Sequence, residues 1–412
     1  MKSNYKKLGP HIQEVNLRNS DLEIDTLLGV SVKKIFIPSI ANTVGTNFKK
    51  YKIVRRSQFT YIADTSRRGD KIGLAFLKSH DSALVSQAYT VFEIIDHNKL
   101  SPEYLMMWFM RPEFNRYSRY KSHGSVREIF NWEEMCDVEL PIPSIEKQQE
   151  IVTEYNTITN RIALNEQLNQ KLEETAQALY KHWFVNFEFP NEEGEPYKSS
   201  GGEMVYNEEL DDEIPEGWKL EKLGNVIESF SKKHDFRKEE LIFFNTSDIL
   251  EGEFLHSNYM NINKMPGQAK KKIQKGDILY SEIRPKNKRY ALVRIDAEDY
   301  VVSTKLMVLR LRTNNFPPYR LYHFLTEKDF IKELQFSAEG RSGTFPQITF
   351  EEDLENKPFL IAIEEIEESW SNLLKNYYEQ HYFRVDENKV LIRTKELLLS
   401  KMTKIEVEKE IL

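Results

Sequence analysis

The sequence is poor in the features that mark disulfide-bonded, metal-binding and membrane proteins. Among its 412 residues Cys136 is the single cysteine, which excludes a disulfide framework and a cysteine metal cluster and fits a reducing cytoplasm. The longest apolar run, residues 104–110, is far shorter than the ~20 residues that a membrane helix needs. The N-terminus lacks the apolar core of a signal peptide. We therefore expect a cytoplasmic protein without a membrane segment.

Motifs for catalysis are missing as well. No Gly-x-Gly loop after a strand indicates a cofactor pocket, and the histidines occur singly, without metal-ligand spacing. Residues 316–319 (FPPY) are similar to the Asn/Asp-Pro-Pro-Tyr motif of amino-methyltransferases, but Phe316 cannot accept a hydrogen bond from a target amine. Asp277, Glu282 and Arg284 match a nuclease carboxylate-pair motif only in part, because that motif ends in lysine. We expect a chain that is not an enzyme and binds no metal or cofactor itself.

The charge of the chain is unevenly distributed. The composition, 40% apolar and 30% charged, describes a folded protein, and the net charge of −7 by itself argues against a nucleic-acid partner. However, residues 47–71 contain eight lysines and arginines and residues 263–294 contain ten, whereas acidic residues collect in 188–216. The local field decides whether a polyanion can dock. One basic run is ordinarily a solvated face, but two runs at matching places in a repeat favour nucleic-acid binding.

Residues 144–183 predict one long helix. The stretch contains no proline or glycine, follows Pro141 and Pro143, and begins at Ser144, a suitable N-cap. Its seam alternates steps of three and four, a heptad pattern, and at ~1.5 Å per residue the helix would be roughly 60 Å long. The seam positions are Ile151, Tyr155, Ile158, Ile162, Asn165, Asn169, Leu172, Ala176, Leu179 and Trp183. The two asparagines would fix register and partner. An ordinary surface amphipathic helix is the alternative, which the length disfavours.

A second helix of the same design follows near the end of the chain. When Ile366 is superposed on Ile151, its seam positions would be Ile366, Trp370, Leu373, Tyr377, Gln380 and Arg384. Gln380 and Arg384 thus take the places of Asn165 and Asn169, after which the match requires a four-residue shift to Leu391. We expect the two helices to lie antiparallel with these two polar pairs close together.

The rest of the chain repeats with nearly the same offset as the two helices. The matched pairs include Ser86 with Ser303, Pro102 with Pro318, and Pro141 with Pro358. This duplication predicts an α+β fold in which two mixed α/β globules are joined and separated by two long antiparallel coiled-coil helices, with an internal pseudo-two-fold repeat. The expected segments are a first globule at 1–143, a spacer helix at 144–185, an acidic loop or linker at 186–214, a second globule at 215–358 and a second spacer helix at 359–412.

In each globule a strand runs into a polar, basic turn, at residues 61–71 and 280–289. Arginine and lysine there can neutralise phosphates or pair with guanine, and the small-residue loops 124–127 and 340–344 let the backbone approach a phosphate. The candidate DNA-binding residues are Lys49, Lys50, Lys52, Ser66, Arg67, Arg68, Lys71, Ser125, Arg127, Lys270, Lys271, Lys272, Arg284, Lys286, Lys288, Arg289, Arg341, Ser342 and Thr344. An ordinary hairpin turn with solvated charge is the alternative for either loop alone. Different loops on matching frames are what the reading of two different half-sites requires.

Several phrases of the sequence resemble the DNA-specificity (S) subunit of Type I restriction–modification systems. They are LPIPSIEKQQEIV (140–152), LYKHWFVNFEFP (179–190), PYKSSGGEMV (196–205), IPEGWKLEKLG (214–224), GSVREIF (124–130) and GTFPQI (343–348). The similarity spans nearly the whole chain. The segment that leads from the second globule into the second long helix, Lys357-Pro-Phe-Leu, departs from the family's usual Leu-Pro-x-Pro form.

The resemblance implies a non-catalytic subunit with two target-recognition domains, each reading one half of a bipartite site in double-stranded DNA. It also implies that the helices set the spacing between the halves and dock two methyltransferase (M) subunits. Those partners would bind S-adenosylmethionine and methylate adenine N6, and restriction (R) subunits would join for cleavage. Two alternatives are a coiled-coil interaction scaffold without DNA readout, and a fused enzyme, which would need a cofactor site that we do not find.

Overall fold

The computed structural model describes residues 5–39, 45–66, 69, 71–124, 127–312 and 318–404. The chain divides into two compact units. Unit 1 comprises Met1–Glu166 and Val385–Leu412, and unit 2 comprises Gln167–Arg384. Each unit therefore contains a globule together with one portion of each of two long helices, α4 (Ile145–Tyr180) and α8 (Glu364–Lys401).

Unit 1 is built on a four-stranded antiparallel sheet with the order β2–β9–β6–β7. Its strands are β2 (Ile12–Val15), β9 (Thr90–Ile94), β6 (Phe59–Tyr61) and β7 (Leu74–Phe76). Phe59 on the central strand β6 stacks on Phe76 and Phe92 of its two neighbours, with ring centroids 4.8 and 5.0 Å apart. Aromatic pairs across neighbouring strands stabilise a sheet beyond the area that they bury.

Shorter strand pairs and three helices complete unit 1. The pairs are β1 (Tyr5–Lys7) with β10 (Glu139–Pro141), β3 (Leu28–Val30) with β4 (Phe36–Pro38), and β5 (Lys52–Arg55) with β8 (Ser82–Val85). The helices are α1 (Pro102–Met110), α2 (Pro112–Lys121) and α3 (Trp132–Cys136). Ser101 caps α1, because its Oγ accepts a hydrogen bond from the Tyr104 amide at 3.4 Å.

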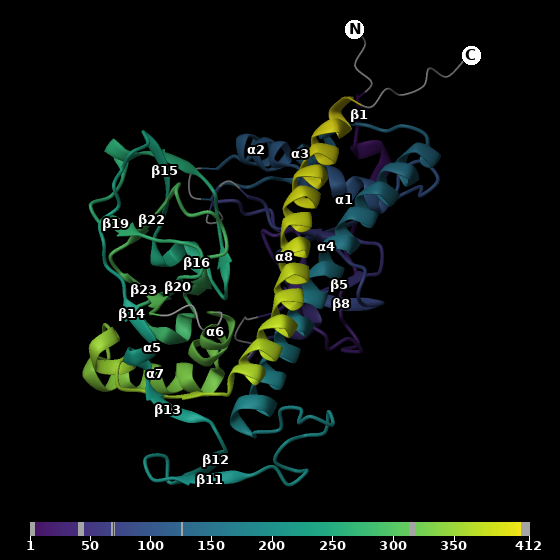
Figure 1. Ribbon diagram of the computed structural model, residues 1–412. Coiled ribbons are helices and arrows are strands. Elements are labelled where there is room, and N and C mark those ends of the chain that lie inside the picture. The colour runs from purple at the N-terminus through teal and green to yellow at the C-terminus, as the bar shows by residue number, and fades with distance from the viewer. Residues whose placement is uncertain are drawn as a thin grey trace. The chain divides into compact units, whose positions relative to one another are not determined.

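Unit 2 repeats this architecture. Its main sheet has the equivalent order β14–β23–β20–β21, so that each strand has a counterpart in the main sheet of unit 1. The strands are β14 (Ile227–Ser229), β23 (Leu306–Leu311), β20 (Ile278–Ser281) and β21 (Tyr290–Leu292). The helices α6 (Pro318–Thr326) and α7 (Lys328–Arg341) follow in the places of α1 and α2 and pack on the sheet (Figure 1). The duplication predicted from the sequence is confirmed by this identical strand order.

The remaining elements of unit 2 are short. A second sheet has the order β18–β15–β22–β19, from strands Tyr259–Asn261, Glu240–Phe244, Tyr300–Ser303 and Ala269–Lys272. The other pairs are β11 (Met204–Asn207) with β12 (Asp212–Pro215), β13 (Lys219–Lys222) with β24 (Pro358–Ile361), and β16 (Ile249–Leu250) with β17 (Glu253–Phe254). A single turn, α5 (Leu223–Val226), follows β13.

The segment 186–214, which we expected to be an acidic loop or linker, is packed against unit 2 over part of its length. The ring of Phe189 lies 4.5 Å from that of Tyr197 and 5.3 Å from that of Trp218. Farther on, β11 and β12 form a hairpin. The acidic and glycine-rich composition concealed these aromatic residues, which bury enough apolar surface to order the chain around them.

A buried glutamine fixes the globule of unit 1 to the start of α4. Ser144 caps the helix as predicted, since its Oγ accepts from the Lys147 amide at 3.4 Å. One turn in, Gln148 is completely buried. Its Oε1 accepts from the Ser101 amide at 2.8 Å, and its Nε2 donates to the carbonyls of Lys99 and Pro143, both at 2.8 Å. One side chain thus links the start of α1, the exit from the globule and the first turn of α4.

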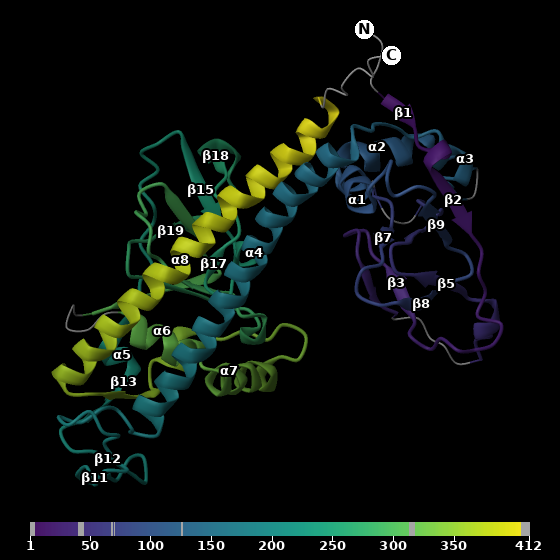
Figure 2. The same cartoon turned by 90° about the vertical axis from the view of Figure 1, so that its right-hand side faces the viewer.

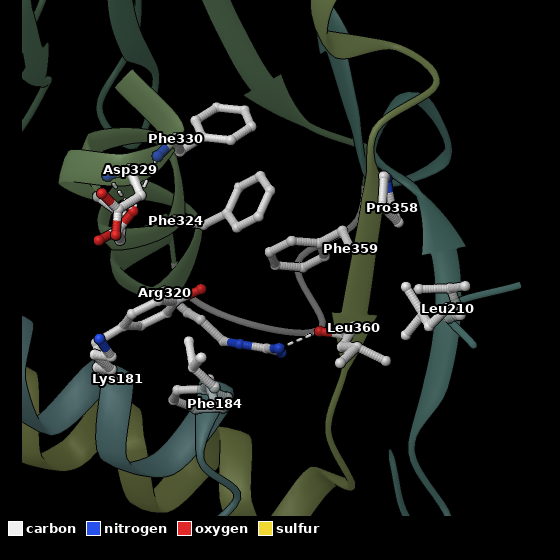
Figure 3. A pocket seen from close by; sticks show the side chains of 14 residues that line it. Lys181, Phe184, Leu210, Arg320, Phe324, Asp329, Phe330, Pro358, Phe359 and Leu360 are labelled. Atoms are coloured by element: carbon white, nitrogen blue, oxygen red, sulfur yellow. Dashed lines mark hydrogen bonds between the residues drawn. The ribbon is translucent and has the colours of Figure 1, made fainter. Parts of the chain in front are cut away.

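Unit 2 makes the equivalent joint with an ion pair. Glu367, in the first turn of α8, is 4% exposed, accepts from the Ala362 amide at 3.1 Å and pairs with the buried Arg320. Arg320 also donates to the Leu360 carbonyl, and Figure 3 shows its guanidinium reaching toward that oxygen beside Phe184. The position of Arg320 in α6 is that of Tyr104 in α1, whose hydroxyl donates to the Pro141 carbonyl at 3.0 Å. The same joint is therefore built from different chemistry.

The second long helix begins later than the expected segment 359–412. Residues Pro358–Ile361 form β24 and pair with β13, so that α8 starts only at Glu364. Pairing with a strand fixes an extended backbone, which a helix cannot share.

In each unit the portions of α4 and α8 lie side by side (Figures 1 and 2). In unit 2, Asn169 Nδ2 donates to the His381 carbonyl at 3.1 Å and the Tyr377 hydroxyl donates to Glu173 at 2.7 Å. The residue number rises along one helix as it falls along the other, so these portions are antiparallel. In unit 1, Asn165 is completely buried and its Nδ2 donates to Glu387 and Asn388 at 2.7 and 2.8 Å.

These contacts correct the predicted partners of the asparagines. Gln380 and Arg384 hydrogen-bond to each other at 3.1 Å, and Gln380 is exposed, whereas the Asn165 side chain meets Glu387 and Asn388. The prediction came from superposing the helices in the same direction, but antiparallel helices bring each residue opposite a different one. The buried face of α8 also differs from the predicted seam.

The next two buried positions of α8 after Trp370 are Leu374 and Tyr378, which are 0% and 3% exposed, while the predicted Leu373 is 42% exposed. The buried residues that follow Trp370 are thus spaced by four residues and again by four, whereas the predicted heptad pattern placed the next buried residue three positions after Trp370. By contrast, every predicted seam position of the first long helix is buried or half-buried. The heptad spacing therefore describes the contact face of α4 better than that of α8.

A buried histidine lies between α6 and the long helices in unit 2. His323 is 0% exposed, its Nε2 is 3.0 Å from the Tyr378 hydroxyl, and its Nδ1 is 3.1 Å from Gln177 Nε2. Burial lowers the pKa of His323 to about 4 from an ordinary value of 6.5, so the ring is neutral near pH 7.

We expect this histidine to make the chain less stable as the pH falls from 6.5 toward 4. In that window the unfolded chain binds a proton at His323 and the folded chain does not, which shifts the equilibrium toward unfolding. The pKa difference corresponds to about 3 kcal/mol of unfolding free energy. Urea unfolding at a series of pH values checks this. In His323→Gln the same pH dependence should be weaker by that amount, and an identical pH profile in the variant would contradict the assignment.

Candidate nucleic-acid interface

In unit 2 the structure joins the two predicted loops. Arg284, in the turn after β20, donates its amide to the Pro346 carbonyl at 3.1 Å and its Nη2 to the Thr344 carbonyl at 3.0 Å. The neighbouring Ile283 forms a β-bridge with Gln347. The turn continues through the 3₁₀ helix Pro285–Asn287. Its tight course is possible because Arg284, with φ of +48°, adopts the left-handed conformation that costs a non-glycine residue about 1 kcal/mol.

Unit 1 contains the same junction at the equivalent position. Asp64, after β6, forms a β-bridge with Ile129, and the Thr65 amide donates to the Glu128 carbonyl at 2.9 Å. The Thr65 hydroxyl also donates to Ser122 Oγ at 2.9 Å. Gly124 opens the second loop with φ of +142°, and a Cβ there would lie 2.0 Å from the Arg127 carbonyl oxygen, so glycine is required. The predicted Arg67, Arg68 and Ser125 lie outside the described residues.

Several of the predicted cations are presented to solvent. Apart from Arg341, which is described below, the exposed ones are Lys49, Lys50, Lys71, Arg127, Lys270, Lys272, Arg284 and Lys286. Two of them pair with acids, Lys272 with Asp235 at 3.6 Å and Lys286 with Glu339 at 3.0 Å. Such exposed pairs contribute little and can be exchanged for a phosphate. Arg284 is distinct, because its guanidinium donates to an uncharged carbonyl and keeps its charge available.

Other predicted residues make contacts within their own unit. Lys52 is 6% exposed and its Nζ lies 3.4 Å from Glu14. Lys271 donates to the Leu306 carbonyl at 2.8 Å, and burial lowers its pKa. Arg289 donates to the carbonyls of Ser247 and Ile249 at 3.1 and 2.9 Å. These side chains are engaged within their own unit rather than presenting free charge.

The small polar residues of the loops act in the same way. Ser66 Oγ donates to Asp64 at 2.6 Å, and Ser342 Oγ accepts from the Phe345 amide at 3.1 Å. The predicted cation Lys288 is also paired, with its Nζ 3.1 Å from Glu251. The loop carbonyl that Arg284 uses belongs to Thr344.

Arg341 is the anchor of the second loop. Its Nη2 donates to both carboxylate oxygens of Asp353 at 2.7 Å, and its other nitrogen donates to Glu352 at 2.8 Å. Hydrogen bonding to Asp353 raises the pKa of Arg341. Asp353 also accepts from the Thr349 amide at 2.8 Å, so Arg341 ties the end of α7 to the segment that follows the loop.

Two residues near the loops were missed by the sequence reasoning. Phe345 is 69% exposed directly after Thr344, and Lys305 pairs with Glu282 at 3.2 Å next to the turn. The position of Phe345 within the phrase GTFPQI was the available signal. Both carboxylates of the partial nuclease motif form ion pairs. Glu282 pairs with Lys305, and the fully buried Asp277 pairs with Arg310 at 2.7 Å.

Within the described part of the chain, no helix is long and apolar enough to cross a membrane. Over the same residues, no group of three or more histidine, cysteine, aspartate or glutamate side chains is arranged to hold a metal ion.

Two copies of one α+β unit, each with a joined pair of loops at the same position, define a duplicated protein with two equivalent domains. The profile of the Type I restriction modification DNA specificity domain matches residues 22–174 and 215–392, once in each half. The chain belongs to this family.

Named relatives agree with this assignment, and one solved structure shares the fold. The HindI specificity subunit of Haemophilus influenzae is 47% identical over 135 residues, which are 32% of this chain and 29% of that protein. The MjaIX specificity subunit of Methanocaldococcus jannaschii is 27% identical over 316 residues, 75% of this chain and 70% of that one. A Type I restriction–modification S subunit from M. genitalium shares the fold with a TM-score of 0.57 and 12% identity, over 97% of this chain and 95% of that one.

We expect Arg341→Ala to lower the unfolding free energy by about 1–2 kcal/mol. It leaves the buried Asp353 carboxylate without its cation, and the cost stays below that of a fully buried pair because the Arg341 side chain is 38% exposed. Urea unfolding measures the change. Arg237→Ala, which removes an 85% exposed arginine of the same unit, is the matched control and should change stability by less than about 0.5 kcal/mol. Equal losses in both variants would contradict an anchoring role.

Proposed function

We propose that the chain is the DNA-specificity subunit of a Type I restriction–modification system and that each globule reads one half of a bipartite site. The observation that carries this proposal is the loop junction that occurs once per unit at the same place in the repeat. Ile283 pairs with Gln347 in one unit, and Asp64 pairs with Ile129 in the other. The backbone frame is the same, while the side chains that it presents differ, as two unequal half-sites require.

The chemistry of the loops suits base and phosphate contacts. The Arg284 guanidinium is exposed, carries a permanent charge and can donate two parallel hydrogen bonds to guanine or to a phosphate. Lys71, Arg127 and Lys286 are exposed at the same junctions and can neutralise phosphates. Together these groups offer one specifying contact and several positioning contacts, the division of labour found in protein–DNA interfaces.

The two long helices, α4 and α8, would form the spacer between the half-sites as an antiparallel coiled coil. The buried amide of Asn165 supports this, because a polar group inside a helix interface stabilises one register over its neighbours. A fixed register would fix the distance between the globules, and therefore the number of base pairs left unread.

The chain would act without catalysis of its own. Two methyltransferase subunits that carry S-adenosylmethionine and modify adenine N6 would dock on it, and restriction subunits would join for cleavage in the cytoplasm. The names of the relatives support the assembly. A coiled-coil scaffold without DNA readout gives no reason for two different loops on one frame.

Filter binding of the purified chain to DNA that carries the methylated motif of its host system tests the proposal. If the exposed cations contact phosphates, the logarithm of the binding constant should fall steeply with the logarithm of the salt concentration, by about 0.9 per phosphate. DNA binding that is absent, or that does not depend on salt, would refute DNA readout and leave the scaffold.

We expect Arg284→Ala to relax recognition in one half-site only. A base-reading arginine contributes about 1–3 kcal/mol of discrimination, so a binding selection over randomised sites should show degeneracy at one or two neighbouring base pairs. Lys286→Ala should instead weaken binding to all sequences alike and flatten the salt dependence by about one phosphate. Arg237→Ala serves as the control for a lost exposed arginine. Degeneracy in both halves would contradict the assignment of one half-site to each globule.

Replacing Asn165 and Asn169 together by leucine should broaden the spacing that the chain accepts between half-sites. Leucine packs at several registers, whereas the asparagines donate to fixed partners on α8. A binding selection over sites with spacers of different length measures the preference. Gln380→Leu changes an exposed position of α8 and is the control. An unchanged spacer preference in the double variant would show that these residues do not specify the register.

A further inference from the structure

Each unit contains a groove at the same position of the repeat. In unit 1 the groove lies between the turn from β3 to β4, the end of β7, α1 and the N-terminal turns of α4, with a volume of about 350 Å³. In unit 2 it lies between the end of β21, the start of α6 and α8, with a volume of about 640 Å³. Equivalent residues line both, among them Lys78 and Arg294, which follow the ends of the equivalent strands β7 and β21. A feature that occurs twice at one place in a duplicated fold points to a ligand that occurs twice.

The groove of unit 1 combines an apolar wall with a buried amine that lacks a hydrogen-bond partner. Met106, Met107 and Met110 line it, and methionine side chains adapt to varied apolar ligands. Lys34 also lines it, is 6% exposed, and among the described residues its Nζ has no hydrogen-bond partner. Burial lowers the pKa of Lys34 to about 7. Lys78 stands at the edge, 56% exposed and 3.4 Å from Glu103.

The groove of unit 2 repeats this combination with different residues. Arg294 is half-buried, its guanidinium lies over the ring of Tyr382, and its Nε finds no acceptor in the described part of the chain. Tyr319 and Tyr378 form the apolar wall, with ring centroids 4.7 Å apart. Lys375 on α8 adds an exposed cation at the edge. Both grooves therefore pair a large apolar surface with a basic side chain that has a buried nitrogen without a hydrogen-bond acceptor among the described residues.

We propose that the two grooves dock two copies of one protein partner, each copy inserting an acidic segment with a large apolar side chain. This inference rests on the proposed function, in which the methyltransferase subunit is the partner present in two copies. An incoming carboxylate would supply the hydrogen-bond acceptor that the buried cation lacks, and the apolar side chain would be buried against methionine in unit 1 and tyrosine in unit 2.

The burial of the cations favours a protein side chain over DNA as the occupant. Phosphate contacts are made by exposed lysines and arginines that reach the backbone of a duplex. Lys34 is 6% exposed and Arg294 lies over an aromatic ring, so an anion must enter the groove to meet either of them. A carboxylate on a flexible side chain can do so, and burial against the apolar walls stabilises the apolar side chain that the same partner segment inserts.

Native mass spectrometry of the chain co-expressed with the methyltransferase subunit of its own system tests the inference. The unmodified chain should carry two methyltransferase subunits. Lys78→Glu places a negative charge at the edge of one groove and Lys375→Glu does so at the other, and each should reduce the number from two to one. The double variant should carry none. Both lysines are exposed, so folding should be preserved, which the thermal unfolding midpoint verifies.

Lys389→Glu is the control, because Lys389 is an exposed lysine on α8 that lies in neither groove. It should keep both methyltransferase subunits. The inference is overturned if the groove variants keep two subunits, if Lys389→Glu loses as many, or if the unmodified chain carries none.

DNA binding by the chain alone separates this inference from the proposed function. The groove variants should keep the salt dependence and half-site preference of the unmodified chain. A parallel loss of DNA binding in Lys78→Glu and Lys375→Glu would make the grooves nucleic-acid contacts and overturn the docking of an acidic segment. If the unmodified chain binds no DNA while the variants still lose methyltransferase subunits, the proposed function fails and the docking surface stands.

Discussion

The buried polar side chain in the first turn of each long helix is the contact on which the geometry of each unit depends. Gln148 satisfies the buried Ser101 amide and Pro143 carbonyl and the partly buried Lys99 carbonyl, at the meeting of α1, the globule exit and α4. Leaving such groups unsatisfied costs about 1–3 kcal/mol each. The orientation of the globule on its helix is therefore set by directional bonds as well as by apolar packing, which tolerates sliding.

The second unit solves the same problem with charge, and the difference shows what the duplication preserves. Glu367 occupies the place of Gln148, and Arg320 occupies the place of Tyr104. Arg320 also reaches the Leu360 carbonyl, as Tyr104 reaches that of Pro141. The two halves have thus kept the position of each link and replaced its chemistry. A buried ion pair gains little net stability after desolvation, so geometry is the property that both versions share.

Much of this architecture could be read from the sequence, because periodicity and repetition report directly on backbone geometry. The start of α4 at Ser144, the cap at Ser101 and the matching of the two halves follow from local residue chemistry and spacing. The seam of α8 could not be predicted, since Leu373 and Leu374 are both apolar and only the partner helix decides which one is buried. The packing of segment 186–214 was hidden for a similar reason: its few aromatic residues are ordered by Trp218, which lies outside it.

The candidate site was likewise predictable at the level of loops and not of side chains. Arg284, Arg289 and Arg341 are indistinguishable in the sequence, yet the first is exposed, the second is bonded to backbone carbonyls and the third anchors Asp353. Side-chain direction in a turn depends on residues that only the fold brings near.

The junction that joins the loops explains how such a site can diverge. It is held mainly by backbone groups, through the β-bridges Ile283–Gln347 and Asp64–Ile129 and the amide of Arg284 on the Pro346 carbonyl. Backbone hydrogen bonds do not depend on side-chain identity, so residues that project from the junction can change while the frame is kept. The anchoring arginine tolerates fewer changes, because Asp353 is buried and needs its cation. Variation in recognition should therefore concentrate at positions such as Arg284, whose side-chain contact is a single bond to a neighbouring carbonyl.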